Sequence, residues 1–172
     1  KNGLVSCPVV AIDHIHPFIE EKPDHLWGYY CCGQITSSNR FLAYPAGRNR
    51  MLGALLFKYN IEGFLQWGFN FYNSHLSLES VDPYATSTAG GWVPGGDPYV
   101  VYPGKEGKAV PSLRLEVFRE ALQDLRALEA LAGKMPKSSV NSRDAIIIAL
   151  GLEELHFDKF NANNAELIHL RE

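Results

Sequence analysis

Apolar side chains occupy both parities of residues 61–72, whose sequence is IEGFLQWGFNFY. Strict alternation would predict a strand with one exposed face, whereas this continuous apolar run predicts a strand buried on both faces, as in a parallel sheet. The run ends in polar groups at Asn70, Tyr72 and Asn73, just before a long loop. In an α/β barrel, polar side chains at the carboxyl ends of strands form the active face. The stretch therefore predicts a fold and the place of a site.

The rest of the chain alternates between apolar runs and helical spacing. Further strands are predicted over residues 8–13, 26–33 and 97–103, the last of them short. Helices are predicted over residues 15–22, 43–60, 111–132, 141–150 and 163–172. In the second of these, Leu52, Leu55, Leu56 and Tyr59 follow the spacing of one buried helix face. Residues 74–98 form a loop of unusual length, and such loops are usually functional or disordered.

The alternation of strand and helix predicts an α/β fold with a parallel sheet. Four strands are half of an eight-stranded barrel, which typically has about 250 residues. We therefore expect residues 1–132 to form the C-terminal half of a (β/α)8 TIM-type barrel with parallel strands. Residues 133–172 are expected to add C-terminal helices. A half-barrel alone exposes two sheet edges, so the missing strands are expected on the N-terminal side.

Composition excludes several classes of partner. The net charge of −3 and the absence of a basic run argue against nucleic acid. No apolar run approaches about 20 residues, so no membrane span is expected. The chain starts at Lys1 and ends within a helical pattern, so we expect a larger parent protein and predict no compartment. Its three cysteines, Cys7, Cys31 and Cys32, form no framework. Cys31 and Cys32 are interpreted as buried free thiols, with a redox pair as the alternative.

Several motifs occur together in an order that resembles a known family. They are LWGYYCCG, NRFLAYPAGRNRMLGALLFKYNIEGFLQWGFNFYN, DPY, GGDPYVVYPG and VPSLRLEVFREALQDLRAL. This order is similar to the C-terminal half of the catalytic domain of glycoside hydrolase family 123 and its relatives, the domain of unknown function 4091. The resemblance covers roughly residues 11–131.

The resemblance implies a barrel enzyme that removes β-linked N-acetylgalactosamine from glycoconjugates by a retaining, substrate-assisted mechanism. In such a mechanism the acetamide of the sugar attacks the anomeric carbon, an Asp orients it, and an adjacent Glu is the general acid; this is a recognised exception to the two-carboxylate scheme. No cofactor is implied. The partners implied are an N-acetylhexosamine glycoconjugate and the missing N-terminal half of the barrel.

Two departures from the family pattern matter here. The Asp-Glu pair of the family has no counterpart, because this chain contains no Asp-Glu dipeptide. We therefore expect no catalytic residue in this chain and no activity from it alone. Ala121 stands where the family commonly has a glycine in the last matched helix, which is a conservative change.

Six residues are candidates for sugar binding. Asp13 ends the first predicted strand, where it would either bond a hydroxyl or cap the following helix. Asn70 can donate and accept, which suits hydroxyls or an acetamide. Tyr72 and Tyr102 lie at strand ends. Tyr84 and Trp92 lie on the long loop, where each either stacks on a sugar ring or anchors the loop to the fold.

Three functional hypotheses remain from the sequence. The first is a glycosidase barrel half that supplies the sugar-binding wall but not the acid. The second is a non-catalytic carbohydrate-binding or scaffold barrel, which an upstream Asp-Glu pair would argue against. The third is a metal-dependent hydrolase using Asp13, His14 and His16. With no further ligand cluster in the sequence, the two histidines are interpreted as surface residues and no metal is expected.

Overall fold

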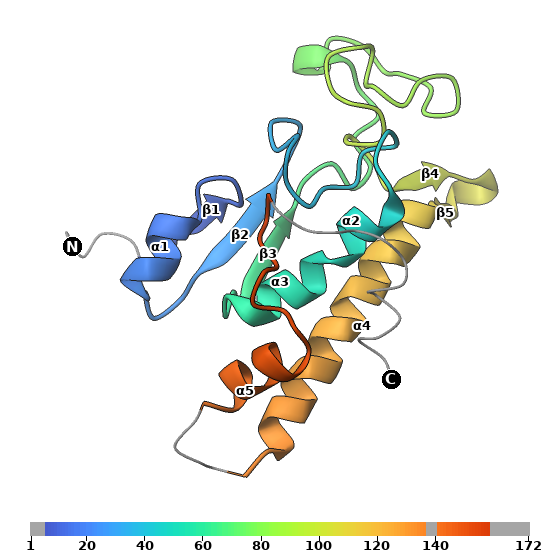
Figure 1. Cartoon of the computed structure of the whole chain (residues 1–172). Helices are drawn as coiled ribbons and strands as arrows, with labels where there is room; N and C mark the ends of the chain where they lie inside the picture. Colours follow the sequence, from blue (N-terminus) through green and yellow to red (C-terminus); the bar gives the residue numbers. More distant parts are fainter. Residues whose placement is uncertain (1–5, 137–140, 159–172) are drawn as a thin grey trace.

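The computed structural model describes residues 6–136 and 141–158. Helices and strands alternate along the first part of the chain, and a hairpin and two helices follow (Figure 1). The elements are β1 (Val9–Ala11), α1 (His16–Glu21), β2 (Trp27–Tyr30), α2 (Ala46–Arg50), α3 (Leu52–Lys58), β3 (Gly63–Gln66), η1 (His75–Ser77), β4 (Val101–Pro103), η2 (Lys105–Gly107), β5 (Ala109–Pro111), α4 (Leu113–Lys134) and α5 (Ser142–Ala149). None of the helices in these two ranges is long and apolar enough to cross a membrane.

The first three strands form one parallel sheet in the order β1-β2-β3, as the alternation of strand and helix predicts. Val10, Gly28 and Phe64 lie side by side across it. A side chain at position 28 would point at Ile12 and Ile15, which are fully buried. The side chains of this parity therefore face the core.

Helices α3 and α4 pack against each other and cover this core face (Figure 1). Leu52, Leu55 and Leu56 of α3 are buried, so the predicted apolar face is confirmed. Phe64 bridges the layers, because its ring lies 4.8 Å from that of Tyr30 and 6.2 Å from that of Phe118 in α4 (centroid distances).

The predicted helix over residues 43–60 is divided into two helices, α2 and α3, which meet at Met51, a residue that itself keeps αR dihedrals (φ −60°, ψ −15°). The two helices pack along α4 at very short range. A Cβ atom built on Gly53 would lie 1.9 Å from the carbonyl oxygen of Ala121, so only glycine fits at this crossing.

The other face of the sheet is open. Val9, Trp27 and Leu65 point to it and are 45%, 41% and 50% exposed. The prediction that the central apolar run is buried on both faces is therefore wrong for the described part of the chain, in which Leu65 of this run is half exposed. The strand is also shorter than predicted, because β3 ends at Gln66. Gly68 then adopts a φ of +61°, which turns the backbone towards Asp97 and Pro98.

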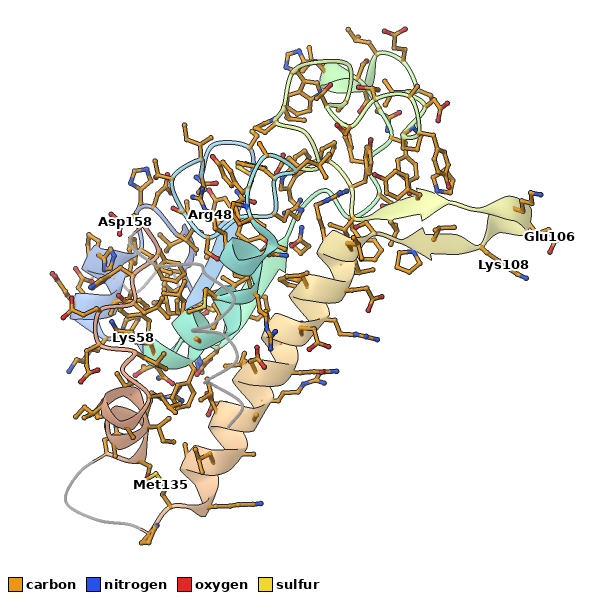
Figure 2. The ribbon with its side chains drawn as sticks, turned by 45° about the vertical axis from the view of Figure 1, so that its right-hand side comes forward. Arg48, Lys58, Glu106, Lys108, Met135 and Asp158 are labelled. Carbon is orange, nitrogen blue, oxygen red and sulfur yellow. The ribbon has the colours of Figure 1, made fainter. Side chains whose placement is uncertain are left out.

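The prediction of a fourth parallel strand over residues 97–103 is wrong. β4 pairs with β5 in a separate antiparallel sheet. The cause lies in the connection, where Glu106 and Gly107 have positive φ and reverse the chain within a few residues. Figure 2 shows Glu106 and Lys108 at the far tip of this hairpin, pointing away from the body of the molecule. The protein is thus a mixed α/β fold, and the described residues contain no closed barrel.

The long helix predicted over residues 111–132 is confirmed as α4. Its N-cap residue Ser112 accepts a hydrogen bond from the backbone N–H of Leu115. The helix predicted over residues 141–150 is confirmed as α5, with Asn141 at its N-cap, and Ile146 joins the core. The division into a 1–132 unit and a 133–172 extension stays a prediction. The helix predicted over residues 163–172 lies outside the described residues.

Candidate functional site

The three parallel strands end at one edge of the sheet, and polar side chains follow each of them. After β1, both carboxylate oxygens of Asp13 accept hydrogen bonds from Nε2 of Gln34, at 3.1 Å each. Oε1 of Gln34 in turn accepts from the backbone N–H of Cys31, at 2.8 Å. Asp13 does not cap α1, whose N-cap residue Ile15 makes no side-chain cap bond. The capping alternative is therefore wrong, and the carboxylate of Asp13 ties the ends of β1 and β2 together.

The two vicinal cysteines follow β2 rather than lying within it. Both are half-buried free thiols, so they are less buried than predicted. Burial is the main cause that raises the pKa of the Cys32 thiol, and the neighbouring Cys31 and Asp97 add to it. At neutral pH Cys32 is therefore a protonated thiol rather than a nucleophilic thiolate.

Beneath this edge lies a buried ion pair that sequence reasoning missed. Arg40 and Asp97 both have fully buried side chains, and Nη2 of Arg40 lies 3.8 Å from Oδ1 of Asp97. Burial raises the pKa of Asp97, while the guanidinium of Arg40 and a hydrogen bond from Trp67 lower it. No sequence signal links the two residues, which lie 57 positions apart.

Four rings gather beyond the end of β3. The centroid of the Trp92 ring lies 6.2 Å from that of Trp67, 6.3 Å from Phe71 and 5.1 Å from His75. Trp92 is nevertheless 39% exposed. The loop side chain thus packs on the fold and still offers part of its ring surface to solvent, which is compatible with both predicted roles.

A second aromatic group joins the long loop to the β4–β5 hairpin. It consists of Tyr72, Tyr84, Tyr99 and Tyr102, with neighbouring ring centroids 5.2–5.5 Å apart. Three of its hydroxyls donate to backbone carbonyls: Tyr72 to Val101, Tyr84 to Pro103 and Tyr99 to Pro83. Burial raises the pKa of Tyr99 to about 12. The Tyr99 hydroxyl therefore stays protonated, and the three hydroxyl-to-carbonyl bonds hold the rings in place.

An open groove of about 540 Å³ lies beside these tyrosines. Its lining residues are Pro83, Tyr84, Ala85, Thr86, Ser87, Tyr102, Val110 and Pro111. Tyr84 is 64% exposed although its hydroxyl is anchored. A fixed and accessible aromatic ring presents an apolar platform with little conformational freedom to lose on binding.

Asn70 stands between the two aromatic groups. Its backbone forms an isolated antiparallel bridge with Tyr99, and its side chain is exposed. The structure therefore brings Asn70, Tyr72, Tyr84 and Tyr102 into one region, and Trp92 joins the neighbouring ring group. Asp13 stands apart from both groups, in its own hydrogen-bond network with Gln34.

The histidines that suggest a metal site do not converge. His14 lies 3.8 Å from the Asp13 carboxylate, whereas the His16 ring packs edge-on against Tyr59 at 5.7 Å. Residues 6–136 and 141–158 contain no group of three or more His, Cys, Asp or Glu side chains that would hold a metal ion.

Comparison with models of protein families identifies a match. The family model described as "Glycoside hydrolase 123, catalytic domain" matches residues 1–131. None of the curated proteins matches the chain. Since the model covers well over half of the sequence, the chain belongs to glycoside hydrolase family 123 through its catalytic domain.

Proposed function

We propose that this chain supplies the sugar-binding wall of a retaining glycosidase that acts on β-linked N-acetylgalactosamine. The observation that carries the proposal is the match to the catalytic-domain model over residues 1–131. The half-exposed Trp92 and the exposed Tyr84 add a physical reason. Sugar rings present apolar faces of axial hydrogens, and fixed aromatic rings cover such faces.

The chemistry follows the substrate-assisted course expected for the family. The acetamide oxygen of the sugar forms a bond to the anomeric carbon as the glycosidic bond breaks and an acid protonates the leaving oxygen. The orienting Asp and the acidic Glu lie outside this chain, which has no Asp-Glu dipeptide. Asn70, Tyr72, Tyr84, Trp92, Tyr102 and Asp13 hold the sugar and its aglycone, and the chain is inactive by itself.

The open sheet face gives the missing half a place to bind. In a closed barrel the side chains of one parity point inward and fill the interior in layers. Val9, Trp27 and Leu65 belong to one such parity, and their side chains are 41–50% exposed in the described part of the chain. The N-terminal half of a (β/α)8 barrel, with its strands alongside β1, covers this face in our proposal.

The test uses the full-length protein and a chromogenic β-N-acetylgalactosaminide. Wild-type protein hydrolyses it, and Trp92→Ala and Asn70→Ala each reduce kcat/KM by about tenfold or more, equal to about 1.4 kcal/mol. Phe18→Ala is the matched control, because Phe18 is 38% exposed but lies on α1. A full-length protein that turns over no N-acetylhexosaminide would contradict the proposal.

The alternative is a non-catalytic carbohydrate-binding or scaffold barrel. It is favoured by the missing Asp-Glu dipeptide, since this chain alone has the wall without the acid. Binding of N-acetylgalactosamine by the full-length protein, lost in Trp92→Ala and without any hydrolysis, would support this alternative.

A further inference from the structure

The ion pair of Arg40 and Asp97 is poorly suited to a purely stabilising role. Both charges are fully removed from water, which costs several kcal/mol per ion unless hydrogen bonds satisfy them. Among the described residues, Nε and Nη1 of Arg40 and Oδ2 of Asp97 have no hydrogen-bond partner. The ring of Tyr30, 5.2 Å from the guanidinium carbon, compensates in part. Apolar side chains of the same volume would stabilise this position equally well.

Each member of the pair makes a hydrogen bond with Trp67. Nη2 of Arg40 donates to the backbone carbonyl of Trp67 at 2.8 Å, and also to the carbonyl of Asp97. Oδ1 of Asp97 accepts from the indole Nε1–H of Trp67 at 3.2 Å. Both the backbone and the ring of Trp67 are thus fixed by the pair. The adjacent Gly68 allows this approach, because a Cβ there would lie 2.6 Å from the carbonyl oxygen of Asp97.

Trp67 passes this orientation on to Trp92. Its ring packs against Trp92 at 6.2 Å and against Phe71 at 5.8 Å, and Phe71 also meets Trp92 edge-on. Trp92 lies on the long loop, far along the chain from β3, and makes no hydrogen bond to any residue that the structure describes. Ring packing is therefore what determines which face of Trp92 solvent or a ligand meets.

We propose that Arg40 and Asp97 are positioning residues that hold Trp67, and through it the sugar platform Trp92. They touch neither sugar nor reacting atoms. This inference rests on the proposed role of Trp92 in sugar binding and adds the buried support that this role requires. Loss of this buried support weakens substrate binding and leaves the chemical step of the bound substrate nearly unchanged.

The experiment measures KM and kcat of the full-length protein on the chromogenic β-N-acetylgalactosaminide. Asp97→Asn removes the charge and keeps an oxygen for the indole. Because that change leaves a buried guanidinium unpaired and risks misfolding, Trp67→Phe is the second variant, which keeps the ion pair but removes the indole N–H and part of the ring that packs on Trp92. Each is expected to raise KM about tenfold with kcat within about twofold. Asp124→Asn is the matched control, since it removes the charge of the Arg50–Asp124 pair between α2 and α4.

A double-mutant cycle with Trp92→Ala separates positioning from general destabilisation. If Asp97 and Trp67 act through Trp92, their effects on KM disappear in the Trp92→Ala background. Effects that stay fully additive, or an unchanged KM in a folded Trp67→Phe protein, would overturn the inference.

Failure of the proposed function is distinguishable from failure of this inference. If wild-type protein hydrolyses no N-acetylhexosaminide, acrylamide quenching of the remaining tryptophans in a Trp27→Phe background replaces the assay. Asp97→Asn is then expected to change the quenching of Trp67 and Trp92, and Asp124→Asn is not. Identical quenching in both variants would overturn the inference without any reference to activity.

Discussion

Gly53→Ala tests the closest helix contact in the molecule. A Cβ at position 53 would lie 1.9 Å from the carbonyl oxygen of Ala121, 2.8 Å from its carbonyl carbon and 3.2 Å from its Cα. An ordinary contact is about 3.5 Å, so α3 and α4 would have to separate by about 1.5 Å. All three atoms belong to the backbone of α4, so no side-chain rotation relieves the clash.

The magnitude follows from two opposing terms. Overpacking of this kind costs about 3 kcal/mol, and Ala regains about 1 kcal/mol through its better helix propensity. The net loss is about 2 kcal/mol in the free energy of unfolding. For a chain of this length the midpoint temperature then falls by about 4–8 °C. Urea unfolding followed by circular dichroism measures the first quantity, and a thermal scan measures the second.

Gly133→Ala is the matched control, because Gly133 also lies in a helix but has no atom within 4 Å of its Cβ position. This variant is expected to gain about 0.5–1 kcal/mol from helix propensity alone. If Gly53→Ala is as stable as wild type or more stable, α3 and α4 do not cross as closely as described.

Two further changes probe local features. Ser112→Ala removes the N-cap of α4 and is expected to cost about 1 kcal/mol in urea unfolding, whereas Ser112→Asp keeps an acceptor and most of the stability; equal losses would refute the cap. The pKa of His25 is raised above 6.5, chiefly by its hydrogen bond to Glu62 at 2.8 Å, so the stability from this pair is present below pH 6.5 and is lost as pH rises through the raised pKa. Glu62→Gln should return the His25 pKa, measured by NMR titration, towards 6.5; an unchanged titration would show that Glu62 is not the cause.

Local patterns predict most of the elements correctly. The apolar runs around β1 and β2, the spacing of Leu52, Leu55 and Leu56, and the start of α4 after Pro111 all depend on neighbours within a few residues. The antiparallel pairing of β4 is also set by nearby residues, but it is not predictable from them. It is set by two positive-φ residues in the turn that follows, one of which is Glu106, and no residue-type rule predicts positive φ for a glutamate.

Some residues of the candidate site could be predicted from the sequence, and others could not. Tyr72, Tyr84 and Tyr102 are predicted from their places at strand ends and on the loop, and the structure brings them together. Arg40 and Asp97 are 57 residues apart, and the sequence contains nothing that links them. Their pairing depends on how the long loop returns to the end of β3, which is a property of the whole fold.

The uncovered sheet face has a consequence for anyone who produces this chain. Large apolar side chains lie in one plane there, and within the described residues both outer strands leave backbone groups without a neighbouring strand. Two copies that pack face to face through these side chains would bury them from water. Concentrated samples are therefore expected to self-associate. If the proposed N-terminal half completes the sheet, co-expression with it is expected to give monodisperse material.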